Sequence, residues 1–198
     1  MTAMPHAFRS RVAKLSLFLA ISFSCFFLLV PARSDVRGCH CEGLTLSEMQ
    51  KQRDCSLCVE AEKQPPYVEI FFLKDANPTK PNRLLVLPKA HEPGAHSLAS
   101  LSPELRHLLW ATAITKAQET WGDGWAIAYN GDERRTQCHT HLHIGKLLPD
   151  QEGGQPLVVK GAADIPVPTD GTGLWVHPAE GKLHVHLGQQ VKETVLMR

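Results

Sequence analysis

The segment "RRTQCHTHLHIGKLLPD" (134–150) carries a histidine at every second position, at His139, His141 and His143. Side chains two residues apart point to the same face of a β-strand. We therefore expect a strand over 136–144 that presents all three imidazoles on one face. Neighbouring imidazoles are costly to bury without partners, so the spacing indicates a functional site.

The residues alone leave three interpretations of this pattern open. Histidines that alternate along a strand can ligate zinc. An imidazole titrates near neutral pH, so it can also attack phosphorus as a nucleophile and then leave. The third interpretation is a set of exposed histidines without a role.

The elements around this segment predict an α+β domain with a mainly antiparallel sheet and one long helix. Strands are expected at 67–73, 83–88, 125–130 and 156–159, with a last hairpin around "PAEG" (178–181). The helix begins with Ser102 as its cap and Pro103 at its first position, and "GDG" (122–124) ends it. Its apolar residues recur at helical spacing: Leu105, Leu108, Leu109, Ala113 and Ala117. A short helix is predicted for 45–52.

Residues 1–34 have the composition of a targeting segment. Basic residues precede an apolar run, "LSLFLAISFSCFFLLV" (15–30), and Ala32-Arg33-Ser34 has the small-x-small form of a cleavage site. This order is typical of a secretory signal, which is either cleaved after Ser34 or retained as a membrane anchor. Both alternatives place the rest of the chain outside the cytoplasm, in the periplasm or the extracellular space.

The charge of the domain argues against a nucleic-acid partner. The whole chain has a formal net charge of +1, and residues 1–34 hold four basic and no acidic residues, so 35–198 carries −3. Such a domain lacks the broad positive field that attracts nucleic acid. Any phosphate that it binds must be held by local groups.

Several motifs in the same order resemble the histidine-triad superfamily. The triad itself fits His-φ-His-φ-His-φ-φ over 139–145, "LKDANPTKPNRLLVLPKAH" (73–91) resembles the strand, turn and strand that end in Pro-Lys-x-His, and "GWAIAYN" (124–130) resembles the phosphate-binding approach. Within the superfamily, "NGDERRTQCHTHLHI" (130–144) is most similar to the CDP-diacylglycerol pyrophosphatase branch. The resemblance implies an antiparallel half-barrel with a helix packed on it.

The resemblance also implies roles for individual residues. His141 would be the nucleophile that forms a nucleotidyl-histidine intermediate, and His143 would contact the phosphate oxygens. His139 would orient the strand or bind a metal. The remaining implied substrate ligands are Asn130, Gln137 and Arg135. No cofactor is required for this chemistry.

The cysteines leave zinc and disulfides as alternatives. Cys55 and Cys58 form a C-x2-C pair, which suits half of a zinc site or a disulfide. In zinc-binding members of the superfamily the corresponding cysteines act with the positions of His91 and His139, which implies a structural zinc. An exported domain favours disulfides instead, with Cys39 and Cys41 as further candidates. Cys138 is expected on the face opposite the triad, as a core residue.

The sequence thus divides into a leader (1–34), a cysteine-containing segment (35–54), a histidine-triad-like catalytic domain (55–150) and a C-terminal hairpin extension (151–198). The expected activity is hydrolysis of a nucleotide-linked phosphoanhydride, with CDP-diacylglycerol giving CMP and phosphatidate. Soluble dinucleotides or nucleoside phosphoramidates are the alternative substrates, and a non-catalytic metal-binding exported protein is the alternative function.

Two further expectations concern surfaces away from the triad. The chain is expected to associate with a membrane, and a homodimer is left open. His177, His184 and His186 form a second group on the last hairpin, interpreted as a polar sheet face or as a second metal or phosphate site.

Overall fold

Seven antiparallel strands form a single sheet in the order β1-β2-β4-β3-β6-β7-β5. The computed structural model describes residues 39–90, 96–168, 170–189 and 192–198, so the predicted leader and His91 lie outside the described residues. The strands are β1 (Ile70–Lys74), β2 (Leu84–Pro88), β3 (Trp125–Tyr129), β4 (Leu142–Lys146), β5 (Leu157–Val159), β6 (Gly173–Ala179) and β7 (Lys182–Gln189). The prediction of a mainly antiparallel α+β fold is confirmed.

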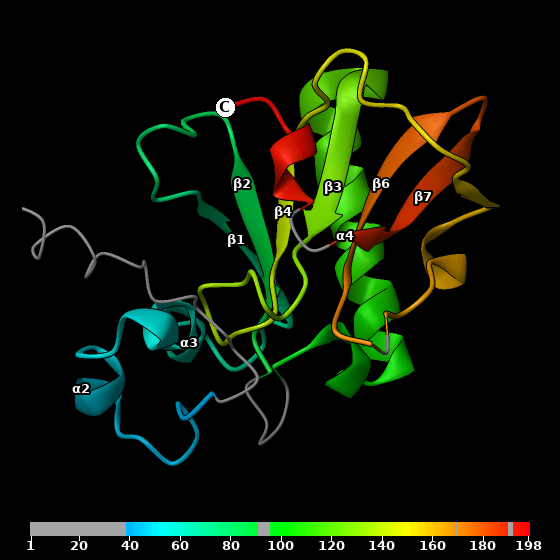
Figure 1. Ribbon diagram of the computed structural model, residues 1–198. Coiled ribbons are helices and arrows are strands. Elements are labelled where there is room, and N and C mark those ends of the chain that lie inside the picture. The colour runs from blue at the N-terminus through cyan, green and yellow to red at the C-terminus, as the bar shows by residue number, and fades with distance from the viewer. Residues whose placement is uncertain (1–38, 91–95, 169, 190–191) are drawn as a thin grey trace, which may run out of the picture. The chain divides into compact units, whose positions relative to one another are not determined.

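Helix α4 (Pro103–Trp121) covers one face of this sheet (Figure 1). The Ser102 hydroxyl accepts a hydrogen bond from the Leu105 amide at 3.2 Å. Pro103 occupies the first helical position, where a backbone N–H would have no partner within the helix, so the missing N–H of proline costs nothing. The helix ends at Gly122, whose φ of 56° is one that glycine adopts without strain. Both predicted ends of the helix are therefore confirmed.

The face of the sheet that meets α4 forms the main hydrophobic core. Ile127, Ile144 and Val176 from three adjacent strands are fully buried there with Leu109 and Ala113 of α4. Strand residues one position away face the opposite side. That opposite face holds a row of paired positions across four strands, made of His143, Ala128, Trp175 and His186.

The last two strands form the predicted hairpin. Ala179 pairs with Lys182, which leaves a two-residue loop of Glu180 and Gly181. Their φ values of 50° and 73° are both positive, as a type I′ turn requires. The same hairpin belongs to the central sheet because β6 pairs with β3, and residues 34–198 form one compact unit. The sequence analysis divides the chain after residues 54 and 150. The segments on either side of each boundary belong to a single fold.

Two disulfides fix the N-terminal segment, which includes helices α2 (Leu46–Met49) and α3 (Ser56–Glu62). Cys39 is bonded to Cys138, and Cys41 is bonded to Cys55. The predicted pairing of Cys55 with Cys58 is therefore wrong, since the Cys55 sulfur is bonded to the residue 14 positions earlier. Cys138 is fully buried as predicted, although as half of a disulfide. Helix α3 was not predicted.

Among the described residues, no helix combines the length and the apolar character needed to cross a membrane.

Candidate active site

The three histidines of the triad do not share one strand. Strand β4 begins at Leu142, so only His143 lies in it, and His139 and His141 occupy the extended segment before it. The predicted strand over 136–144 therefore starts too early. Cys138 explains the difference, because its disulfide and its amide, which donates to the Asp54 carbonyl at 2.8 Å, hold this segment on the N-terminal region.

His141 is held in one tautomer. Its Nδ1 lies 2.8 Å from the carbonyl oxygen of His139, and because a carbonyl can only accept, Nδ1 carries the proton. The other ring nitrogen, Nε2, then has an unshared electron pair. Burial, together with the neighbouring His143, lowers the pKa of His141 to about 3, so the ring is neutral at physiological pH. A neutral, oriented imidazole is the form that can act as a nucleophile.

His143 lies beside His141, with 4.9 Å between the ring centroids in an edge-to-face arrangement. Its Nε2 is 3.4 Å from the Asn130 amide nitrogen, which is a donor, so Nε2 accepts. Its Nδ1 is 3.3 Å from a Glu193 carboxylate oxygen. Burial and the positive charges of Lys80 and Arg83 lower the pKa of His143 to about 3, so this ring is also neutral.

Asn130 connects the site to the C-terminal segment. Its side-chain oxygen accepts hydrogen bonds from the amides of Lys192 at 2.9 Å and Glu193 at 3.1 Å. This fixes the amide orientation, so that Nδ2 is directed to His143. Asn130 therefore presents a neutral donor to His143, and its role as a substrate ligand stays a prediction.

Arg135 places a buried positive charge near His141. Its side chain is 2% exposed, and one terminal nitrogen donates to Asp132 at 2.9 Å. The guanidinium carbon lies 5.4 Å above the ring of Tyr129. Nε and the second terminal nitrogen have no hydrogen-bond partner among the described residues, and the charge contributes to the lowered pKa of His141. A buried guanidinium with donors to spare suits a phosphate ligand.

Gln137 points to a different region from the one predicted. Its side-chain oxygen accepts from Ser56 Oγ at 2.7 Å and from the Leu57 amide at 3.3 Å, at the start of α3. Its side-chain nitrogen donates to the Arg53 carbonyl at 2.9 Å. The amide is thus engaged by the N-terminal segment, and a phosphate-binding role would require it to leave these contacts.

Of the predicted zinc ligands, Cys55 and Cys58 pack in one cluster and the Cys58 thiol contacts the His139 backbone, but their donor atoms are engaged otherwise. Cys55 is in a disulfide, and burial raises the pKa of the Cys58 thiol to about 12, so that it stays protonated. His139 donates from Nε2 to the Pro88 carbonyl at 2.7 Å, and this contact fixes the segment before β4 to the end of β2. His91 lies outside the described residues. Among the described residues, side chains of ligating types gather in four places, two of which include disulfide-bonded cysteines. The other two are Glu152–His177–His184 and Asp75–His143–Glu193.

The C-terminal residues beside the triad were not predicted from the sequence. Glu193 contacts Lys80 at 2.8 Å and Arg83 at 3.3 Å as well as His143. Lys192 is fully buried, and burial lowers its pKa to about 8. Both residues belong to a short polar tail without a motif or periodicity, so nothing in the sequence marks them as part of this site.

The second histidine group lies on the same sheet face as His143, on the last two strands. The rings of Trp175 and His186 are stacked with centroids 3.9 Å apart. Burial lowers the pKa of His177, and burial with the neighbouring His177 and Lys192 lowers that of His186 to about 4. These rings are therefore neutral at physiological pH.

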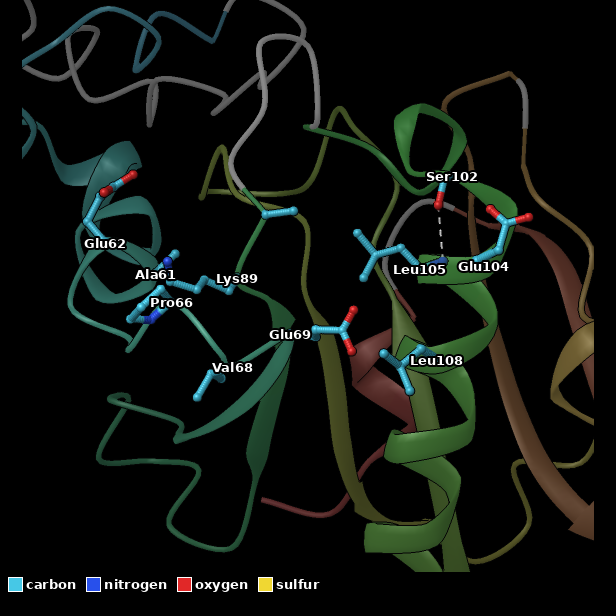
Figure 2. A pocket seen from close by; sticks show the side chains of 11 residues that line it. Ala61, Glu62, Pro66, Val68, Glu69, Lys89, Ser102, Glu104, Leu105 and Leu108 are labelled. Atoms are coloured by element: carbon cyan, nitrogen blue, oxygen red, sulfur yellow. Dashed lines mark hydrogen bonds between the residues drawn. The ribbon is translucent and has the colours of Figure 1, made fainter.

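A separate pocket of about 610 Å³ lies among α3, the ends of β1 and β2, and the first turns of α4. Figure 2 shows the Glu69 carboxylate directed toward Leu108 on α4. Glu62, Glu104 and Lys89 also line this pocket, and no triad histidine does. With three carboxylates and one ammonium it would repel a polyanionic nucleotide, so the pocket is a poorer candidate than the triad.

No known protein-family model matches the chain.

Proposed function

We propose that this protein is a phosphoanhydride hydrolase of the histidine-triad type, acting through a nucleotidyl-histidine intermediate. The observation that supports this most directly is the pairing of a neutral, oriented His141 with the buried charge of Arg135. A metal site would need no buried guanidinium beside its imidazoles. The antiparallel sheet with one covering helix is compatible with the histidine-triad fold.

In the first step, the electron pair on His141 Nε2 would attack the α-phosphorus of the substrate. A P–N bond forms while the bond between that phosphorus and the bridging oxygen breaks, and the leaving phosphate keeps the electron pair. Arg135 and the Asn130 amide would donate to the phosphoryl oxygens, whose charge must be stabilised in the transition state. His143 would contact these oxygens as well.

In the second step, water would release the nucleotide. The water oxygen bonds to phosphorus, the P–N bond breaks, and its electron pair returns to His141 Nε2. The proton that water loses ends on the released phosphates. Each atom is accounted for without a metal, and the enzyme returns to its starting state.

For the substrate, we propose a CDP-linked phospholipid, which would give CMP and a phosphatidate. The Arg135-Thr136-Gln137 run before the triad resembles the pyrophosphatase branch, and the leader at 1–34 directs the domain to or across a membrane. The two disulfides suit the same exported location. Selectivity would come from the pocket, because a net charge of −3 gives no long-range attraction for nucleotides.

The predicted structural zinc is proposed only for the reduced chain, in which Cys55 is released from Cys41. Reductively prepared protein would then bind about one zinc per chain through Cys55 and Cys58, and Cys58→Ser would lose it. Elemental analysis of reduced and oxidised samples separates the two states. Reduced protein without zinc at these cysteines would remove this part of the proposal.

The nucleophile is tested with His141→Asn, which removes the attacking nitrogen while keeping a side chain of similar polarity. Turnover should fall to less than about a hundredth of wild type, since even a general base contributes about 10²–10⁴-fold. His107→Asn, at an exposed histidine of α4, is the matched control and should keep full activity. Mass spectrometry of base-quenched enzyme, which preserves the acid-labile P–N bond, should locate a nucleotidyl adduct on His141. Greater residual activity, or an adduct on another residue, would refute the assignment.

The substrate class is tested by comparing kcat/KM for CDP-diacylglycerol in mixed micelles with that for diadenosine polyphosphates and nucleoside phosphoramidates. We expect the lipid to be the preferred substrate. A preference for a soluble substrate would overturn the lipid assignment and leave the triad chemistry in place. No turnover of any of them would count against the hydrolase itself.

A further inference from the structure

A second cluster of ligating side chains lies on the sheet face that carries His143. His177 of β6 and His184 of β7 are directly paired across the hairpin, and Glu152 reaches them from the loop before β5. His186 lies two residues along β7 from His184. Strand β3 separates β6 from β4, so the cluster is about 10 Å or more from His143 at the usual strand spacing.

The ligand atoms of Glu152, His177 and His184 lie close together. His184 Nδ1 lies 2.8 Å and His177 Nε2 lies 3.7 Å from the same Glu152 carboxylate oxygen. His177 Nε2 is also 3.3 Å from His186 Nε2. Ligands about 2.0–2.2 Å from a tetrahedral zinc ion are separated by about 3.3–3.6 Å. The observed separations bracket this range.

We propose that Glu152, His177 and His184 bind one divalent transition-metal ion, with His186 placed to complete the site. Two or three imidazoles with one carboxylate form a donor set that suits zinc, whereas calcium and magnesium prefer oxygen ligands alone. The three ligand atoms of the proposed core lie within 4.8 Å of one another. This inference goes beyond the proposed hydrolase activity and does not depend on it.

The surroundings of His177 match those of a metal ligand. Its Nδ1 is 3.2 Å from the Pro178 carbonyl, so Nδ1 donates and Nε2 presents its electron pair to the cluster. Ligating histidines usually donate their second N–H to such an oxygen, which fixes the ring. The ring is 3% exposed and stacks on Trp175 at 5.0 Å, which orients it further.

A simple surface hydrogen bond accounts for less of the geometry. One such bond joins His184 Nδ1 to Glu152, and a separate one is needed between the Nε2 atoms of His177 and His186. A single bound cation would instead hold the ligand atoms of Glu152, His177 and His184 together. Binding would also hold the loop that carries Glu152, whose side chain is 54% exposed, against the hairpin.

The test uses the full-length chain in mild detergent, with intact disulfides and an affinity tag that lacks histidine. After treatment with a chelator, Zn²⁺ is titrated against a competing metal indicator, and Co²⁺ is added separately to record the absorption of tetrahedral cobalt. About one Zn²⁺ should bind per chain. At 100-fold excess over the Kd, the bound ion should raise the Tm by about 5–10 °C.

Glu152→Gln and His184→Ala are the informative variants, since both side chains are partly exposed and their loss should not prevent folding. Each should weaken Zn²⁺ binding by at least about 10–100-fold and abolish the rise in Tm, because even losing an outer partner has that effect. His107→Ala is the matched control and should bind as wild type does. Absence of saturable binding in wild type would overturn the proposal. So would binding unchanged in both variants, or lost only in His143→Ala, which would place the ion at Asp75–His143–Glu193.

Discussion

Removal of the disulfide between Cys39 and Cys138 tests how the site is held in place. The bond joins residues 99 positions apart, so it closes a loop that includes helix α4 and the strands β1, β2 and β3. In the chain-entropy model, a loop of that length limits the unfolded state enough to stabilise the fold by about 4.7 kcal/mol. The disulfide between Cys41 and Cys55 closes 14 residues and should contribute about 3 kcal/mol.

The double variant Cys39→Ala with Cys138→Ala should therefore lower the Tm by about 10–20 °C, at about 2–4 °C per kcal/mol for a domain of this size. The variant Cys41→Ala with Cys55→Ala should lower it less. Cys58→Ala is the control, since it removes a fully buried sulfur that forms no cross-link. Thermal unfolding of the full-length chain, followed by circular dichroism in oxidising buffer, measures all three.

Loss of the long disulfide should also reduce turnover. Cys138 immediately precedes His139, whose carbonyl orients the His141 ring. A freed segment would misplace His141, the proposed nucleophile, and a displacement of about 1 Å can cost about 10²-fold in rate. If the long-loop variant unfolds no more easily than Cys58→Ala, or is more stable than the short-loop variant, the reasoning from loop length is refuted.

Three other predictions follow from the site. Because the folded pKa values of His141 and His143 are about 3 and unfolded histidine has about 6.5, the unfolded state binds more protons between these values. Stability should thus fall as pH is lowered from about 6.5 to 3, and urea midpoints should fall less steeply in His141→Asn; an equal slope would contradict this. Arg135→Met should lower kcat by about 10²–10³-fold, the usual effect of losing a transition-state donor. The exposed Arg134→Met is the control and should change kcat little in the same assay. Equal effects of the two variants would exclude Arg135 as a donor to the transition state. Asn130→Ala should cost about 1–3 kcal/mol in urea unfolding, because it leaves one buried and one partly buried backbone amide without their acceptor, and a smaller loss would show that water replaces it.

Local patterns in the sequence predicted most of the secondary structure. Helix α4 was placed at both ends because its cap, its proline and its terminal glycine act on neighbouring atoms. The last hairpin was placed for the same reason, since two residues with positive φ determine its turn. The strand before His143 was misplaced because a disulfide and one long-range hydrogen bond outweigh the alternation of side chains.

The residues of the candidate site also differ in whether the sequence alone could identify their roles. The alternating histidines were selected from the sequence because residue type and spacing limit the chemistry that they can perform, and Asn130 and Arg135 were implied by the resemblance to the histidine-triad superfamily. The tautomer of His141, the redirected Gln137 and the contribution of Glu193 depend on partners that lie close only in the folded chain. The pairing of the cysteines also depends on the fold. Cys55 is bonded to Cys41, 14 positions earlier, and not to Cys58, and Cys39 is bonded to Cys138, 99 positions later. Burial and distance between remote segments set charge state and orientation, and neither quantity is encoded in local spacing.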